Sequence, residues 1–400
     1  MNQHADPHPS EHRLESRRAL KFVVLLGVVS LFADMTYEGA RSITGPYLAV
    51  LGASGTIVGI VAGGGELIGY MLRLWSGRLA DRTHRYWAIT IVGYVVNLLA
   101  VPLLVLAGNW ETAAILMVLE RAGKALRTPA RDAMLSYATK HTGRGWGFGL
   151  HEARDQSGAT LGPLVVAAVL MLNGDYRTGF AVLLIPALAA ISVLLAARWL
   201  FPRPQELEPA GRTLSAQGFS RAYWVYLTGT CLVAAGYADY PLLAYHFERI
   251  GSVSKDWIPI LYAIAMAVDG LAALLFGRWF DRRGIAVLIV ATAVSAFFAP
   301  LAFGEHFDAA LAGAVLWGIG MGAQESIMRA AIAEMTPQHR RGTAYGMFNM
   351  IFGVSWFAGS ALMGWLYDVS LPALIAFSML AQLAAVPLFM MAHRRQRTRP

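Results

Sequence analysis

The chain has 400 residues, 56% of them hydrophobic and 14% charged, with a mean hydropathy of +0.49. Soluble domains are about one-quarter charged and their single cores stop growing well below this length, so an ordinary soluble domain is excluded and a lipid-covered protein is indicated. The lone Cys231 excludes a disulfide framework and a multi-cysteine metal site.

The N-terminal tail, residues 1–19, is basic and is expected to be irregular. It precedes an apolar run in the manner of a signal peptide, but no small-residue cleavage site follows, and Asp34 and Glu38 interrupt the run, so we expect a retained first helix. The tail also contains His4, His8 and His12 at four-residue spacing. Nearby prolines argue against a regular helix there, and metal capture is the alternative to a disordered tail.

Twelve apolar segments follow, each near the length of about 20 residues that spans a bilayer. A first bundle, residues 20–200, holds segments at about 20–47, 55–77, 86–107, 110–127, 146–172 and 178–200. After a polar linker at 201–219, a second bundle at 220–393 holds segments at about 221–247, 257–277, 285–303, 309–334, 342–367 and 371–392, and residues 394–400 form a tail. The expected fold is all-α, with two six-helix bundles.

The net charge of +8 is distributed over short clusters between the apolar runs rather than in one patch, which argues against nucleic acid as a partner. Lys and Arg gather in alternate loops, and the loops between them carry only Arg177, Arg249 and Lys255. By the positive-inside rule both termini are expected in the cytoplasm. The alternation also supports an even number of spans.

One short motif occurs in both bundles, 200 residues apart. It consists of Gly77, Asp81 and Arg82 in the first copy and of Gly277, Asp281 and Arg282 in the second. Each copy lies where one apolar segment ends and the next begins. A second match, at an offset of 197, links glycines of the fifth segment of each half, including Gly149 with Gly346 and Gly162 with Gly359. Duplicated halves that frame a site near mid-bilayer are typical of secondary transporters, whereas close helix packing is the alternative explanation of the glycines.

The first motif and the twelve segments resemble the major facilitator superfamily from Leu20 to His393. The family's signature between its second and third helices has the same Gly-x-x-x-Asp-Arg core, although Thr83 and His84 replace the usual following pair. The resemblance implies a cytoplasmic gate at both copies, broken when the halves rock. A positive-inside anchor explains the arginines but not the repeated Gly-to-Asp spacing.

In this family the first, fourth, seventh and tenth helices line the cavity. The resemblance therefore implies the following lining residues: Asp34, Glu120, Arg121, Asp239, Gln324, Glu325 and Arg329. Arg121 matches a buried arginine that the family links to proton coupling. Glu120 and Arg121 lie about 15 Å along a helix from Trp110, a depth at which ionisable residues are usually functional. Glu325 and Arg329 can also simply pair with each other.

Other charged residues lie elsewhere along the predicted spans. Glu66 and Asp269 fall near mid-depth on the second and eighth segments. Glu38 and Arg41 fall near the outer end of the first segment and are expected to be a solvated rim. Basic residues from Lys124 to Arg131 share a helix face and are expected to be cytoplasmic anchors or gate charges.

The fifth segment matches the first part of the family's antiporter signature at Gly149, Gly158, Gly162 and Pro163, but the closing glycine pair is missing. His151, Glu152 and Asp155 precede these residues, and a carboxylate there can exchange a proton for a substrate cation. A mutually neutralising structural network is the alternative.

No Gly-x-x-x-x-Gly-Lys-Ser/Thr loop is present, so the expected energy source is an ion gradient, with no bound nucleotide, cofactor or metal and no enzymatic activity. The segment from Glu120 to Ala133 resembles bacterial permeases that include nickel-resistance exporters. The expected function is proton-coupled export of a drug-like or cationic compound by a monomer in the bacterial cytoplasmic membrane. Proton-coupled uptake of an organic anion at Arg121 and Arg329, or a non-transporting receptor, are the alternatives.

Overall fold

The computed structural model describes residues 9–139, 144–202, 219–336 and 341–397, apart from some side chains within these ranges, and the regular elements in them are helical. The first half contains α1 (Pro9–Val50), α2 (Gly55–Thr83), α3 (Tyr86–Leu103), η1 (Leu104–Leu106), α4 (Trp110–Thr139), α5 (Arg144–Asn173), α6 (Tyr176–Val182) and α7 (Leu184–Leu200). The second half contains α8 (Arg221–Gly236), α9 (Tyr240–Ile250), α10 (Trp257–Arg283), α11 (Ala286–Ser295), α12 (Phe298–Ala302), α13 (Phe307–Met335), α14 (Arg341–Val369) and α15 (Leu371–Arg397).

In the described part of the chain these helices make twelve membrane-spanning units, because three pairs are broken spans: α6 with α7, α8 with α9, and α11 with α12. Seven of the described units meet the length and hydropathy expected of a membrane span. The others are broken, are short in their described part, or carry ionisable residues, as α4 does at Glu120 and Arg121. Polar groups inside a span must face away from the lipid, and here they face a cavity between the two bundles.

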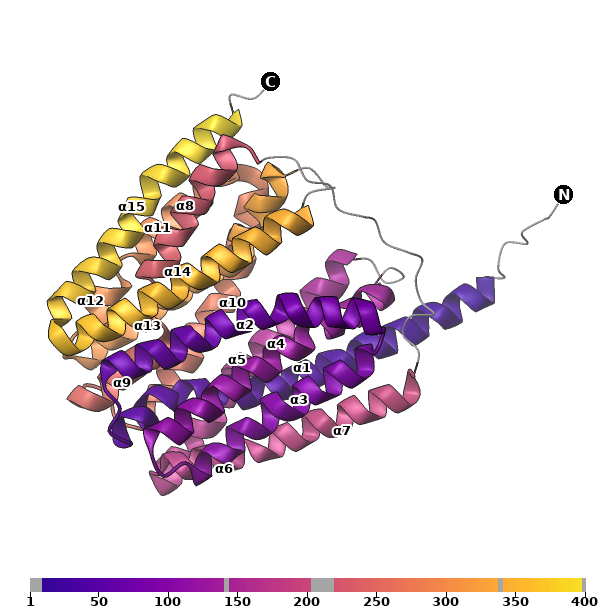
Figure 1. The fold of residues 1–400 in the computed structure, drawn as a ribbon, viewed down its shortest axis with the longest axis horizontal. Helices are drawn as coiled ribbons and strands as arrows, with labels where there is room; N and C mark the ends of the chain where they lie inside the picture. The colour runs from indigo at the N-terminus through magenta and orange to yellow at the C-terminus, as the bar shows by residue number, and fades with distance from the viewer. Residues whose placement is uncertain (1–8, 140–143, 203–218, 337–340, 398–400) are drawn as a thin grey trace.

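The two bundles meet mainly along three helix pairs, α2 with α14, α5 with α10, and α1 with α9, and to a lesser extent where α2 contacts α9 and α1 contacts α10. Figure 1 shows the bundles converging near α9 and diverging toward the side where α1 begins and α15 ends. We call that side the terminal end and the opposite side the distal end. The molecule is therefore closed distally and spread apart at its terminal end.

Small residues allow α2 and α14 to touch through their backbones. A Cβ added at Gly59 would come within 2.3 Å of the carbonyl oxygen of Ser360, and one at Gly364 within 2.5 Å of that of Gly55. These contacts lie toward the distal end of α2, where the helix begins. Any side chain larger than hydrogen at Gly59 would separate the two helices there.

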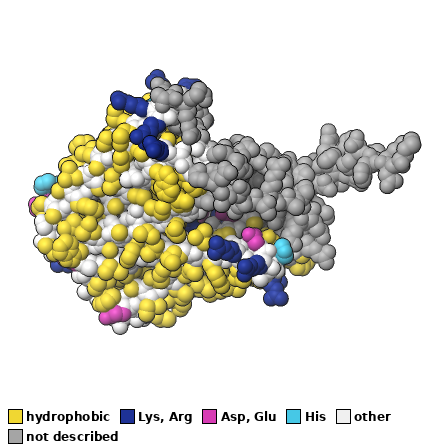
Figure 2. All heavy atoms as spheres, turned by 45° about the horizontal axis from the view of Figure 1, so that its top comes forward, with side chains coloured by type: hydrophobic (Ala, Val, Ile, Leu, Met, Phe, Trp, Pro, Cys, Tyr) yellow, Lys and Arg dark blue, Asp and Glu magenta, His cyan; other side chains and the backbone are white. Residues whose placement is uncertain are grey.

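The outside of the molecule is apolar. On the face drawn in Figure 2, hydrophobic side chains dominate and the visible Lys and Arg side chains gather mainly in two groups. Exposed large side chains include Trp75, Trp199, Trp279 and Leu172, the last being 83% exposed. Such a surface is stable against lipid chains, in agreement with a protein that crosses the membrane many times.

Several helix boundaries differ from those expected. The helix α1 begins at Pro9, so the expectation of an irregular tail is wrong from Pro9 onward, and His12 belongs to a helix. The fourth span was expected to end near residue 127 but continues to Thr139. The seventh span breaks at residues 237–239, directly before Pro241, because proline cannot donate the backbone hydrogen bond that a continuous helix needs.

Candidate functional site

A cavity lies between the bundles and has two compartments that share lining residues, among them Glu38, Arg41, Arg73 and Lys124. The larger compartment, about 340 Å³, reaches from Arg41 to Arg131 and Leu135 on the part of α4 nearer the terminal end. The smaller one, about 190 Å³, lies against α13 and α14. Together they are within the size range of sites for small organic molecules.

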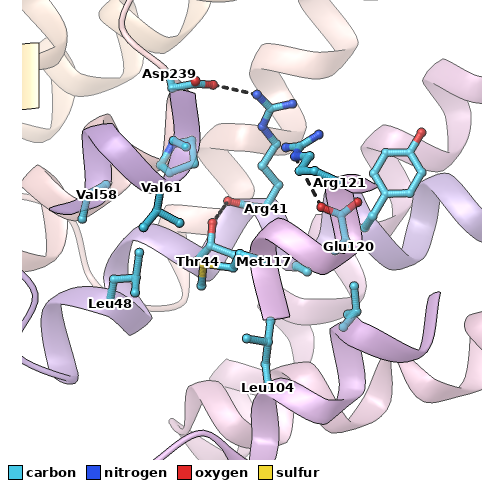
Figure 3. A pocket seen from close by; sticks show the side chains of 15 residues that line it. Arg41, Thr44, Leu48, Val58, Val61, Leu104, Met117, Glu120, Arg121 and Asp239 are labelled. Carbon is cyan, nitrogen blue, oxygen red and sulfur yellow. Dashed lines mark hydrogen bonds and ion pairs between the residues drawn. The ribbon is translucent and has the colours of Figure 1, made fainter. Parts of the chain in front are cut away.

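The floor of this cavity is a chain of ion pairs, which Figure 3 shows in part. One guanidinium nitrogen of Arg41 lies 2.7 Å from Asp239 and 3.5 Å from Glu66. Arg121 lies 3.2 Å from Glu66 and 3.3 Å from Glu120. Each of these buried or partly buried carboxylates therefore has a basic partner, which is how charges are tolerated at this depth.

Two polar contacts of the floor join the bundles. Arg41 on α1 pairs with Asp239, which precedes α9, and the Tyr262 hydroxyl on α10 donates to Glu38 on α1. The second carboxylate oxygen of Asp239 accepts a 2.7 Å hydrogen bond from the indole of Trp356. The break before α9 places the Asp239 carboxylate at a helix N-terminus, where the helix dipole favours a negative charge.

Glu38 and Arg41 are therefore not a solvated rim, as was expected. Glu38 is 8% exposed, and the side chain of Arg41 is 11% exposed. The error arises because the sequence does not show that the second bundle covers these residues, through Asp239 at Arg41 and Tyr262 at Glu38.

A second correction concerns Lys124 and Arg127, which were expected to be anchors or gate charges. Lys124 lies 3.8 Å from Glu38 and 3.8 Å from the centre of the Tyr37 ring. Arg127 is 1% exposed, with its guanidinium carbon 4.1 Å from the centre of the Tyr94 ring. Both residues belong to the interior because α4 continues well beyond them.

Asn97 on α3 connects the floor to Arg127. Its amide donates a 2.7 Å hydrogen bond to the carboxylate of Glu120, and its carbonyl oxygen accepts one of 3.3 Å from Arg127. Gly93 and Gly123 allow α3 and α4 to approach closely enough, since a Cβ at Gly123 would lie 2.4 Å from the backbone nitrogen of Asn97. This amide fixes the orientation of Glu120 at the cavity floor.

A small, mainly apolar pocket of about 40 Å³ lies beside the charged floor. Figure 3 shows Leu48, Val58, Val61 and Leu104 around it, with Arg41, Arg121 and Asp239 at one side. It has room for a few heavy atoms only. The principal cavity thus ends at the charged layer, and this pocket is a minor extension.

The remaining predicted lining residues divide into two groups. Asp34, Asp269 and Glu325 line the larger compartment, and Gln324 and Glu325 line the smaller one. The amide of Gln324 is buried without a hydrogen-bond partner in the described residues. The side chains of His151, Glu152, Asp155 and Arg329 lie outside the described residues, and Gly149 lies on a stretch of α5 whose surroundings are likewise not described.

The repeated Gly-x-x-x-Asp-Arg motif lies at the terminal end of α2 and of α10. Asp81, Arg82 and Arg282 are exposed, Gly77 has only Pro129 nearby, Gly277 has open space, and the side chain of Asp281 lies outside the described residues. After the motif each helix ends at a residue with positive φ, His84 with φ +53° and ψ +18° and Gly284 with φ +57° and ψ −145°. The two copies therefore share the helix end but differ in the backbone conformation at which the chain turns.

On α4, Arg131 pairs with the neighbouring Asp132 at 2.8 Å and donates to the hydroxyl of Ser30 on α1. These contacts keep Arg131 within the first bundle. It lines the wall of the cavity near its terminal end.

The glycines of the fifth span pack on α1. A Cβ at Gly158 would lie 2.5 Å from the carbonyl oxygen of Leu31, and one at Gly162 would lie 2.2 Å from that of Met35. Pro163 is buried beside them within α5. The geometry favours the packing explanation for both glycines.

The distal closure includes a contact that the sequence did not reveal. The Asp368 carboxylate, at the end of α14, accepts hydrogen bonds from the backbone nitrogens of Gly55 at 2.9 Å and Thr56 at 2.7 Å, and from the Thr56 hydroxyl at 2.6 Å. One bundle therefore caps a helix of the other. Tyr176 also donates to Glu248 across the bundles at 2.6 Å.

Arg73, Asn97, Asp368 and Trp356 were also missed. Only Arg73 left a signal in the sequence, an arginine ten residues before the end of a long apolar helix. The other three could be recognised only from the tertiary contacts of their side chains.

Broken and charged helices arranged as two six-helix bundles around a cavity closed at one end define a membrane transporter that works by alternating access. The family profile described as Major Facilitator Superfamily matches residues 26–251 and 226–400. The chain belongs to this superfamily and is a multi-pass secondary transporter, not an enzyme.

Relatives and solved structures agree with this assignment. An uncharacterized protein of Mycobacterium tuberculosis is 41% identical over 389 residues, which cover 96% of this chain and 95% of that protein. The multidrug resistance protein MdtH of Proteus mirabilis is 24% identical over 332 residues, 81% of each chain. The structure of a bacterial homolog of the human lysosomal transporter Spinster, inward-facing and unoccupied, matches with a TM-score of 0.68 at 15% identity, over 95% of this chain and 96% of that one.

Proposed function

We propose that the protein is a proton-coupled exporter of a small drug-like or cationic compound, acting as a monomer in the bacterial cytoplasmic membrane with both termini in the cytoplasm. In that orientation the described conformation is inward-facing, because the bundles spread apart at the terminal end. The observation that carries the proposal is the buried carboxylate floor, in which Asp239 and Glu38 join the two bundles.

The ionisation state of these two carboxylates would control the contact between bundles. An ionised Asp239 holds Arg41 across the interface, and its protonation removes the charge that does so. Arg41 then keeps Glu66 at 3.5 Å, so the buried guanidinium still has an anionic neighbour. Proton binding can therefore loosen the floor without leaving an unpaired charge, as coupling of protons to a rocking motion requires.

The alternative, uptake of an organic anion with Arg121 as binding group, is less well supported. Arg121 is already engaged by Glu66 and Glu120. The likeness to a protein named for multidrug resistance supports export over uptake. The finer resemblance to nickel-resistance exporters rests on one segment, and the proposal is restricted to organic cargo.

Proton exchange in proteoliposomes loaded with a pH-sensitive dye tests the proposal. Ethidium, tetraphenylphosphonium and 2-naphthoate are added in turn to vesicles that hold a pH gradient, and the wild type is expected to release protons with at least one of them. Asp239→Asn and Glu38→Gln should each slow that release about tenfold or more, the scale on which removing a proton-transfer group acts. Glu111→Gln is the control, since Glu111 is exposed in the first turn of α4. Full coupled exchange by the Asp239→Asn, Glu38→Gln double variant, or no release by the wild type with any compound, would contradict it.

A further inference from the structure

Arg73 differs from the other basic residues that line the cavity. Among the described lining residues, Arg41, Arg121, Lys124 and Arg131 each have a carboxylate within 4 Å, and Arg127 has the Asn97 oxygen and the Tyr94 ring. Among the described residues Arg73 has no carboxylate within 4 Å and its Nε is buried without a hydrogen-bond partner, while Glu66 interacts with it electrostatically at longer range. The guanidinium carbon of Arg73 lies 5.4 Å from the centre of the Tyr70 ring.

The position of Arg73 determines what its guanidinium can reach. It lies about 15 Å along α2 from the helix end at Thr83, and it precedes Gly77, where the second apolar segment was expected to end. It lines both compartments of the cavity and is partly exposed to them. A guanidinium that faces a cavity and has no ion pair within 4 Å among the described residues is suited to bind a ligand of opposite charge.

Aromatic side chains form the wall next to Arg73. The Tyr70 ring contacts Phe352 edge to face at 6.3 Å, and Phe352 continues to Phe348 at 5.2 Å and to Trp356 at 5.7 Å. These residues and Arg73 line the same smaller compartment. A planar apolar group fits beside such a wall, because offset and edge-to-face ring contacts are favourable.

We propose that Arg73 and this wall, Tyr70, Phe348, Phe352 and Trp356, form a subsite for a compound that carries an anionic group on an aromatic ring. The guanidinium binds the anionic group, for which its planar pair of donors is suited, and the rings hold the aromatic body. This inference rests on the proposed function insofar as it treats the cavity as the cargo site. Of the drug-like or cationic compounds proposed as cargo, it favours drug-like aromatic anions and zwitterions over simple cations.

The test is equilibrium binding to purified protein in lipid nanodiscs, with no gradient, so that it does not depend on proton coupling or on transport direction. The probes are 2-naphthoate and 2-(aminomethyl)naphthalene, which share a ring system and differ in charge. The variants are Arg73→Gln and Arg73→Lys, and Arg78→Gln is the control on the same helix because Arg78 is exposed at the terminal end. Each variant is checked for a monodisperse elution profile and for wild-type thermal stability.

We expect the wild type to bind 2-naphthoate and Arg73→Gln to weaken that binding at least about tenfold, as loss of a paired charge does. Arg73→Lys should lose about three- to tenfold, because the charge remains but the paired donors do not. Arg78→Gln should bind as the wild type does, and binding of the amine should not weaken in Arg73→Gln. The proposal is overturned if the wild type does not bind 2-naphthoate, if Arg73→Gln binds it normally, or if Arg73→Gln weakens both probes equally.

Discussion

Removing the carboxylate of Asp368 should shift the protein toward the conformation that is open at its distal end. Asp368 accepts three hydrogen bonds from the start of α2, in the other bundle. Ser54 caps the same helix from its own bundle, so α2 keeps a cap when Asp368 is replaced. The change therefore acts mainly on the contact between bundles rather than on the folding of α2.

The size of this population shift follows from the free-energy cost of losing a helix-capping side chain. Replacing an N-cap side chain costs about 0.5–2 kcal/mol, and the exposure of Asp368 argues against the larger values known for buried charged hydrogen bonds. A loss of about 1–2 kcal/mol changes the ratio of closed to open molecules about 5- to 30-fold. Asp368→Ala should show the full shift, and Asp368→Asn a smaller one because the amide oxygen still accepts a hydrogen bond.

Distances between spin labels across the distal end measure this ratio. Labels at Asn109 and Glu305, both exposed and in opposite bundles, are introduced as cysteines in a Cys231→Ser background. The longer-distance population should grow in Asp368→Ala and remain at the wild-type level in Asp308→Asn, which removes another exposed distal acid. An unchanged distribution in a folded Asp368→Ala protein would refute the reasoning, as would an equal shift in the control.

Three other substitutions test separate features. In Gly59→Ala the new methyl group would lie 2.3 Å from the Ser360 carbonyl oxygen, so the distance between the distal labels should increase. Gly69→Ala is the control, because a Cβ there has nothing within 4 Å and the label distance should stay the same. His84→Gly should raise the free energy of unfolding by about 1 kcal/mol, seen as a higher melting temperature, because glycine adopts φ +53° without strain; a lower melting temperature would contradict the assignment of the turn. Asn97→Leu should lower the free energy of unfolding by about 1–3 kcal/mol in chemical denaturation, since it removes hydrogen bonds from two buried charged groups, and wild-type stability would refute their coupling through this amide.

The fold was largely predictable from the chain because membrane spans and duplication leave direct signals. Apolar segments of the right length and the motif repeated at Gly77 and Gly277 predicted twelve spans in two bundles, and the fold confirms this. The start of α1, the end of α4 and the break before α9 were not predicted. The first two depend on polar helical turns that continue beyond the apolar stretch, and the third depends on how tertiary contacts stabilise the freed backbone.

The site was harder to predict, because the sequence does not show which residue a charged side chain pairs with. Asp239, Glu120 and Arg121 were identified from the family resemblance, and the last two also from their depth, whereas Arg41 was assigned to a rim and proves to be a centre of the floor. The role proposed for Arg73 depends on the whole cavity, since it follows from comparing the partners of all the described basic residues there. No pattern along a single helix contains that information.

Bundles that rock as rigid bodies move the two ends of the molecule reciprocally, one closing as the other opens. The measurement that tests it most directly compares two label pairs in Asp368→Ala, one at Asn109 and Glu305 across the distal end, the other at Arg78 and Arg278 across the terminal end, all four positions being exposed. Rocking bundles predict that the distal distance lengthens while the terminal distance shortens. A longer distal distance with an unchanged terminal distance would show local separation of α2 from α14 and would contradict alternating access by rigid bundles.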